Sequence, residues 1–188
     1  MILRSLMAGL LLLTTAAAAP EYRYQLDGAA SEVAAKVSFL GLASKTARFP
    51  RMSGAIQLRP ERLDTINLDV TLDARAIAAS DGDTQRRLRG PDFFDAENHP
   101  TIRFTGQRMA MGSQTSALVD GTVTARGVTR PVRLKVTFSK PPAQTTGREP
   151  IGFTATTTID RYQFGMKAYS MIVGRNVNIM IKARMTPG

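Results

Sequence analysis

The chain has 188 residues, and its 25 Lys and Arg against 15 Asp and Glu give a formal net charge of +10 at pH 7. It has no cysteine and a single histidine, which excludes a disulfide framework and a cysteine nucleophile and argues against a zinc site of the usual ligand types. A chain of this length fits one domain that buries about 70% of its unfolded surface, so it needs no covalent staple.

The first eighteen residues have the pattern of a secretory signal peptide. Arg4 precedes an almost wholly apolar run over residues 6–13, and small side chains follow at Ala16 and Ala18. The run is shorter than the roughly 20 residues that a membrane-spanning helix needs. We therefore predict cleavage after Ala18 and a single exported domain over residues 19–188.

Apolar and polar residues alternate repeatedly between residues 22 and 185, a pattern that predicts β-strands with one buried face. Polar turn residues, many beside Gly or Pro, separate the runs at short intervals. Strands of this number and spacing favour an antiparallel sandwich or barrel. The clearest expected strands span residues 33–39, 66–72, 101–105, 118–124, 132–138, 152–159 and 177–183.

The alternation is lost over residues 76–100, which contain Arg86, Arg87 and Arg89 followed by the sequence PDFFD at 91–95. A connection of that length is uncommon unless it contains a short helix or a functional lid. We therefore predict a partly helical cover over one end of the barrel, with no strand in it. The three arginines are the best candidates for contact with an anionic lipid headgroup.

Catalytic motifs are poorly supported. The single histidine, His99, stands in an Asn-His-Pro turn, where a hydrogen-bonding role is more common than a catalytic one. Asp92 and Asp95 flank two phenylalanines and are typical of turn or helix caps rather than of a glycosidase pair. Neither a Gly-x-Ser-x-Gly elbow nor a glycine-rich phosphate loop is present. We predict that the protein is not an enzyme and uses no metal or cofactor.

The basic excess has two interpretations. Nucleic acid is a poor partner, because aromatic residues make up 6% of the chain, Trp is absent and the basic residues are scattered. A charged, well-solvated surface is the simpler interpretation, and an anionic membrane surface is the alternative.

Several short sequences, in order along the chain after the leader, are similar to those of the YceI family of exported, lipocalin-like barrels. Two positions depart from the family pattern: Phe39 stands where the family usually has His, and Arg175 stands where it often has an acidic residue. The matching sequences are VSFLGL at 37–42, RF at 48–49, SG at 53–54, PDFFD at 91–95, HPTIRF at 99–104, RGVTRPV at 126–132, GFTATTTIDR at 152–161 and FGM at 164–166.

The resemblance implies an eight-stranded antiparallel β-barrel in the bacterial periplasm that encloses a polyisoprenoid, such as a prenyl quinone or a prenyl pyrophosphate. A barrel of eight strands has room for its own side chains or for one slender ligand. Small residues expected on the inner face, namely Ala35, Ala55, Gly121 and Ala155, could leave a channel among larger ones. A solid core, in which small side chains match large neighbours, is the alternative.

We therefore hypothesise a periplasmic carrier of an isoprenoid lipid. The alternative is a basic surface module or stress-response protein that acts at anionic membranes without an internal ligand, and a homodimer stays open for either. Flexible methionines at 52, 166, 171 and 180 are further candidates for the channel. The residues predicted to line the cavity are Phe39, Leu42, Phe49, Leu68, Val70, Phe94, Phe104, Phe153, Phe164 and Met166.

Overall fold

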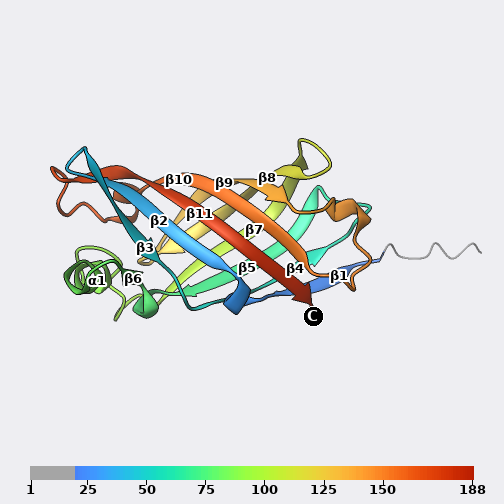
Figure 1. Cartoon of the computed structure of the whole chain (residues 1–188), viewed down its shortest axis with the longest axis horizontal. Coiled ribbons are helices and arrows are strands. Elements are labelled where there is room, and N and C mark those ends of the chain that lie inside the picture. The colour runs from blue at the N-terminus through green and yellow to red at the C-terminus, as the bar shows by residue number, and fades with distance from the viewer. Residues whose placement is uncertain (1–19) are drawn as a thin grey trace, which may run out of the picture.

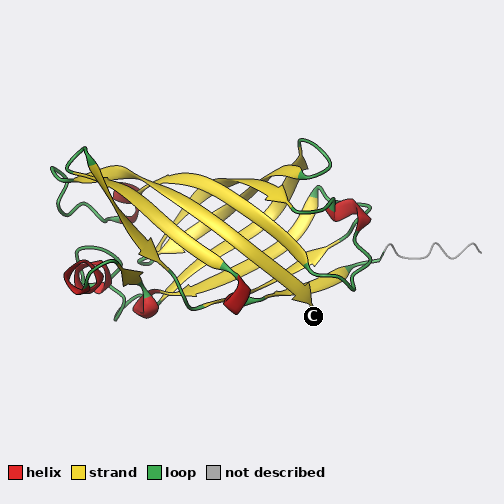
Figure 2. Ribbon diagram, in the orientation of Figure 1, coloured by secondary structure: helices red, strands yellow, loops and turns green. Residues whose placement is uncertain are grey.

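A single antiparallel sheet, curled into a closed barrel, makes up most of the molecule (Figures 1 and 2). The computed structural model describes residues 20–188, so the predicted signal peptide lies outside the described residues. The strands are β1 (Tyr22–Leu26), β2 (Glu32–Phe39), β3 (Ala43–Arg48), β4 (Met52–Leu58), β5 (Thr65–Asp73), β6 (Ala78–Ala79), β7 (Thr101–Met111), β8 (Ser116–Ala125), β9 (Val128–Phe138), β10 (Ile151–Asp160) and β11 (Val173–Pro187).

Eight long strands close the barrel, because four of the shorter ones form two interrupted pairs. β1 and β2 are halves of one strand, separated by the 3-10 helix η1 (Gly28–Ala30), and β3 and β4 are halves of the next, separated by residues 49–51. The fifteen-residue β11 pairs with β10 along one edge and with β2 and then β1 along the other. These pairings close the ring and confirm the predicted eight-stranded antiparallel barrel.

The connection after β5 contains the predicted helix, α1 (Gly82–Arg89), which lies over one end of the barrel (Figure 1). Asp81 caps it, since its Oδ1 accepts the Thr84 N–H at 2.8 Å, and Gly90 ends it. The expectation of no strand in this connection was wrong, because the two-residue β6 pairs with β3. None of the helices in residues 20–188 is long and apolar enough to span a membrane.

Three further 3-10 helices occupy strand ends: η2 (Ala74–Ala76), η3 (Pro142–Gln144) and η4 (Arg161–Phe164). The turn between β2 and β3 (residues 40–42), the segment from α1 to residue 96 and the loop at residues 165–172 meet at the same end of the barrel. We call this end the α1 end. The N-terminus of the described chain emerges at the opposite end (Figure 1).

The interior is divided into two halves. In the half away from α1, side chains such as Leu58, Met109, Val119 and Val136 pack into a buried cluster that fills the barrel. In the α1 half, a second cluster around Phe49 and the residues of the covering segments encloses open space. Both interpretations of the interior therefore apply, a solid core in one half and a cavity in the other.

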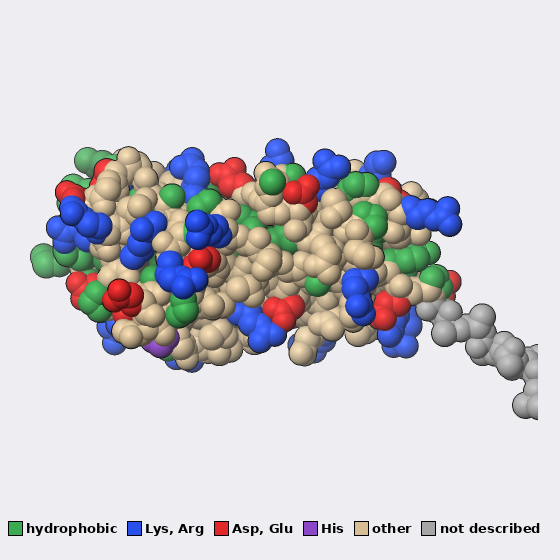
Figure 3. Space-filling model, turned by 90° about the horizontal axis from the view of Figure 1, so that it is seen from below, with side chains coloured by type: hydrophobic (Ala, Val, Ile, Leu, Met, Phe, Trp, Pro, Cys, Tyr) green, Lys and Arg blue, Asp and Glu red, His purple; other side chains and the backbone are tan. Residues whose placement is uncertain are grey.

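The outer surface carries interspersed acidic and basic side chains (Figure 3). Many are cross-strand ion pairs, such as Arg133 with Asp120, at 2.5 Å between Nε and Oδ1. The guanidinium of Arg133 lowers the pKa of the Asp120 carboxyl through their hydrogen bond, and Arg103 lowers that of Asp69 in the same way. These paired and interspersed charges are typical of a surface that faces solvent.

Candidate functional site

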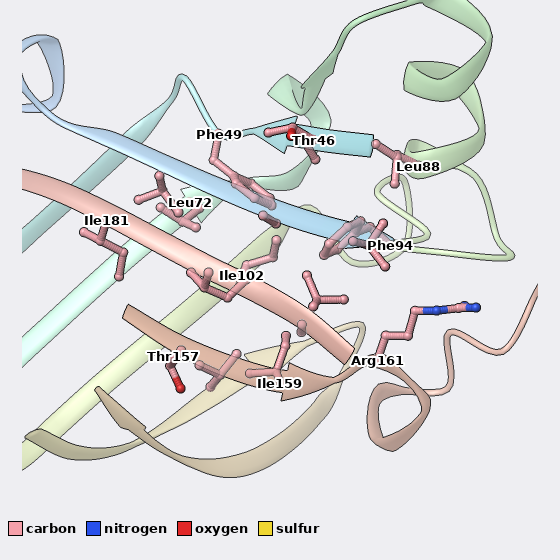
Figure 4. Close-up of a pocket in the computed structure, with 18 of the residues that line it drawn as sticks. Thr46, Phe49, Leu72, Leu88, Phe94, Ile102, Thr157, Ile159, Arg161 and Ile181 are labelled. Carbon is pink, nitrogen blue, oxygen red and sulfur yellow. The ribbon is translucent and has the colours of Figure 1, made fainter. Parts of the chain in front are cut away.

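The α1 half of the barrel contains a cavity of about 490 Å³, within the ordinary range for small-molecule sites. Its walls are apolar side chains from β2, β5, β7, β10 and β11, which point toward one another across the barrel (Figure 4). Thr46, Thr157 and Arg161 are the polar residues labelled in that view. At the α1 end the lining includes Lys45, Thr84, Arg87 and Tyr169, so the cavity reaches the covering segments.

Nine of the ten predicted lining residues lie along this cavity: Phe39, Phe49, Leu68, Val70, Phe94, Phe104, Phe153, Phe164 and Met166. The tenth, Leu42, was wrong, because its side chain is 100% exposed. The last cross-strand pair of the β2–β3 hairpin joins Phe39 to Ala43. Leu42 therefore lies in the turn beyond the ladder, where the alternation of faces no longer applies.

The arginine cluster does not act as one group. Arg87 lines the cavity, whereas Arg86 pairs with Asp83 on the exposed side of α1 and Arg89 donates to the Ile77 carbonyl at 2.9 Å. Successive helical residues are turned by about 100°, so three arginines within four positions cannot share one direction. Of the three arginines only Arg87 lines the cavity, and contact of Arg86 and Arg89 with a lipid headgroup stays a prediction.

Two of the four methionine candidates also lie elsewhere. Met52 and Met166 line the cavity, but Met171 is 97% exposed in the loop at residues 165–172, and Met180 is 48% exposed on the outer face of β11. Lining residues that were not predicted from the sequence include Leu72, Ile102, Val123, Ile159, Ile179 and Ile181. On its strand, each of these residues lies an even number of positions from a buried residue or from a predicted lining residue. The alternation of faces could therefore have identified them as lining residues.

Arg161, which was not singled out from the sequence, is a buried cation in the cavity wall, 3% exposed. Its guanidinium donates to three backbone carbonyls, those of Met166 at 2.5 Å, Val173 at 2.9 Å and Gly174 at 2.9 Å. Burial lowers the pKa of Arg161, although a guanidinium remains charged at any physiological pH. These bonds hold both ends of the loop that closes one side of the cavity.

Two aromatic rings stand at the α1 end. Phe93 stacks on Tyr169, and the guanidinium of Arg87 lies 5.3 Å from the centre of the Tyr169 ring and donates to its hydroxyl. Lys45 lies over Phe39, 5.5 Å from the ring centre, so the phenylalanine that replaces the family's histidine contacts a cation. Within residues 20–188 the lining has cationic groups but no Asp, Glu or His.

The second departure from the family pattern, Arg175, lies outside the cavity lining and forms an ion pair with Asp160 at 2.7 Å. His99 also lies outside it, 3.8 Å from Asp95 and packed against Gly127. Across the described part of the chain, no group of three or more His, Asp and Glu side chains is placed to hold a metal ion.

Known proteins of similar sequence and structure share this architecture. A UPF0312 protein of Pseudomonas putida strain GB-1 is 28% identical over 151 residues, which cover 80% of this chain and 79% of the relative. The crystal structure of Burkholderia cenocepacia BcnA has a TM-score of 0.73 at 22% identity and covers 85% of this chain and 98% of that one.

A polyisoprenoid-binding domain from Saccharophagus degradans, described as implicated in plant cell wall breakdown, has a TM-score of 0.69 at 14% identity, covering 88% and 98% of the two chains. At these identities the solved structures show a common fold. The model of the YceI-like domain matches residues 24–185, from the first strand to the last, and the protein therefore belongs to the YceI-like family.

Proposed function

We propose that this protein binds one long polyisoprenoid lipid inside the barrel and carries it through the periplasm. The observation that supports this most directly is the apolar cavity of about 490 Å³ that extends from the middle of the barrel to the α1 end. The structural similarity to a domain described as polyisoprenoid-binding adds support from an independent source.

The energetics of such a ligand are favourable without specific contacts. Each buried CH₂ contributes about 0.8 kcal/mol, so one five-carbon isoprene unit contributes about 4 kcal/mol before the costs of association. Enclosing a few isoprene units is therefore sufficient for binding. The filled half of the barrel, beyond Phe104 and Phe153, sets the depth to which a chain can enter.

The polar end of the ligand belongs at the α1 end. Lys45, Arg87 and Thr84 supply donors there, whereas acidic groups are missing from the lining in residues 20–188. Such a set favours a headgroup that accepts hydrogen bonds or carries negative charge. A prenyl quinone and a prenyl pyrophosphate both meet this condition, and a lining without a general base supports binding rather than catalysis.

The first test is mass spectrometry of the lipid that co-purifies with the full chain expressed in its exported form. We expect a prenyl lipid near one molecule per chain. Thr157→Trp, which places an indole inside the cavity, should remove it, while Thr156→Trp on the outer face of the same strand should retain it. Lipid retained equally by both folded variants would overturn the proposal.

Export is tested on the same preparation. Cell fractionation should recover the protein in the periplasm, and its intact mass should correspond to a chain that begins at Ala19. A cytoplasmic protein that keeps its first eighteen residues would contradict the carrier role in that compartment.

A further inference from the structure

Four large apolar side chains are exposed together at the α1 end. Leu40 is 61% exposed and Leu42 100%, in the turn after β2, while Tyr169 is 40% and Met171 97% exposed, in the loop before β11. The two segments are neighbours, since the Leu40 N–H donates to the Ile172 carbonyl at 2.8 Å. We call these four residues the apolar tips. Hydrophobic side chains protrude at this end of the molecule in Figure 3.

The fold accounts for Tyr169, which stacks on Phe93, but not for the other three apolar tips. Leu42 and Met171, almost wholly exposed, contribute nothing to the buried core. Leu40 adopts φ +53° ahead of Gly41 at φ +72°, a turn conformation that Asn, Asp or Gly adopts at less cost than a leucine. A strained turn that presents leucines to solvent is a feature that points to a function at the surface.

The charged residues within the two segments that carry the apolar tips are all positive. The two segments at residues 38–46 and 162–175 contain Lys45, Lys167 and Arg175 and no acidic residue. Lys45 and Arg175 pair with Asp81 and Asp160 at their flanks, while Lys167 is exposed. Apolar side chains bordered by cations match the interface of an anionic bilayer, where apolar groups enter the acyl region and cations meet the headgroups.

We infer that the α1 end docks on an anionic phospholipid membrane, with the apolar tips inserted and Lys167 among the headgroups. Docking in this orientation places the cavity end against the bilayer, so that a lipid can pass between them without crossing water. The transfer of a lipid between the cavity and the bilayer rests on the proposed function, whereas docking on the membrane depends only on the surface of the α1 end. The opposite end, where the described chain begins, faces away from the membrane.

The test is flotation of the full chain with vesicles of phosphatidylethanolamine and phosphatidylglycerol, compared with vesicles of phosphatidylcholine. We expect binding to the anionic vesicles that weakens with salt. The double variant Leu42→Ser/Met171→Ser should lower the partition coefficient at least about tenfold. Its matched control is Leu118→Ser/Met180→Ser, which removes an exposed leucine and an exposed methionine from the barrel wall and should bind as wild type does.

Three results would overturn the inference. The wild type fails to float with anionic vesicles, the tip variant floats as well as the control, or the tips mediate a concentration-dependent dimer without vesicle binding. Failure of the proposed function is recognised separately, because Thr157→Trp should still dock with its cavity filled. Conversely, the tip variant should still take up a prenyl lipid from detergent micelles.

Discussion

The ring of Phe93 lies parallel to that of Tyr169, with 6.0 Å between the ring centres and 8° between the planes. Phe93 belongs to the segment that follows α1, and Tyr169 belongs to the loop before β11, so the pair joins two covering segments that are distant in sequence. Both residues line the cavity. The stack therefore stands at the α1 end of the cavity, where the proposed lipid would enter or leave.

Replacing Tyr169 with Ala should accelerate uptake and release of a prenyl lipid. A stacked aromatic pair contributes about 0.5–1.5 kcal/mol, so the free energy of unfolding should fall by a similar small amount. Stopped-flow transfer of a fluorescent prenyl lipid measures the rates, and Tyr169→Phe, which keeps the ring but loses the hydroxyl that accepts from Arg87, serves as the control. Equal rates in the alanine variant and wild type would show that the stack is no barrier.

Replacing Arg161 with Met should destabilise the whole domain. The variant keeps an apolar stem but leaves three carbonyls without their donor, which costs about 3 kcal/mol at roughly 1 kcal/mol each. For a domain of this size that corresponds to a fall in Tm of about 6–12 °C in a thermal melt. Arg161→Lys should recover little of the loss, because one ammonium cannot reach three carbonyls in the guanidinium geometry. A wild-type Tm in Arg161→Met would contradict this role.

Acid should weaken the attachment of α1. The Thr84 N–H, and then Lys45 and the Thr84 hydroxyl, hold the pKa of the Asp81 carboxyl well below its unfolded value of about 3.9. A lowered pKa means that its stabilisation is complete above about pH 4 and is lost as the pH falls through the native value.

Asp81→Asn keeps a capping oxygen but removes the charge. Thermal melts should show a lower Tm than wild type at neutral pH, and the difference should narrow as the pH falls below about 4. A difference that stays constant across this range would mean that the charge of Asp81 does not contribute.

Replacing Gly121 with Ala should disturb the floor of the cavity. A Cβ at this position would lie 2.2 Å from the Thr105 carbonyl oxygen and 2.8 Å from the Phe104 ring, so the backbone of the neighbouring strand or the ring must shift. Overpacking of this kind costs about 1–3 kcal/mol. Chemical denaturation measures the loss, and Gly82→Ala, which meets no atom within 4 Å, is the control that should leave the midpoint almost unchanged.

Alternation along the strands predicted most of the fold and the cavity wall. In β10 the inward positions 153, 155, 157 and 159 continue to Arg161, so the same period that placed Phe153 in the wall could also have placed the buried cation. A charged residue at the end of an apolar series is ordinarily assigned to solvent. Arg161 is buried instead, because the loop that follows presents backbone carbonyls that accept hydrogen bonds from its guanidinium.

The errors occur where the periodicity ends or changes. Leu42 follows the last pair of a hairpin, so its apolar character could not show which way it faces. Met180 lies on the outer face of β11, because it stands between Ile179 and Ile181, whose side chains line the cavity. It was predicted from its flexible side chain and not from its position in the strand. The three arginines of α1 are close in sequence, but successive residues of a helix point in different directions, and only Arg87 lines the cavity.

The double pairing of β11 also governs the order in which the molecule can assemble. Pro187 pairs with Tyr24, so the first and last strands of the sheet meet only after the last residues of the chain have become available. The ring of strands is closed only once β11 has paired with both β2 and β1. Contacts between such distant residues form slowly. Before the barrel closes, the proposed lipid could bind to the inner face of the sheet from the side. A lipid bound during folding would not need to pass through the α1 end.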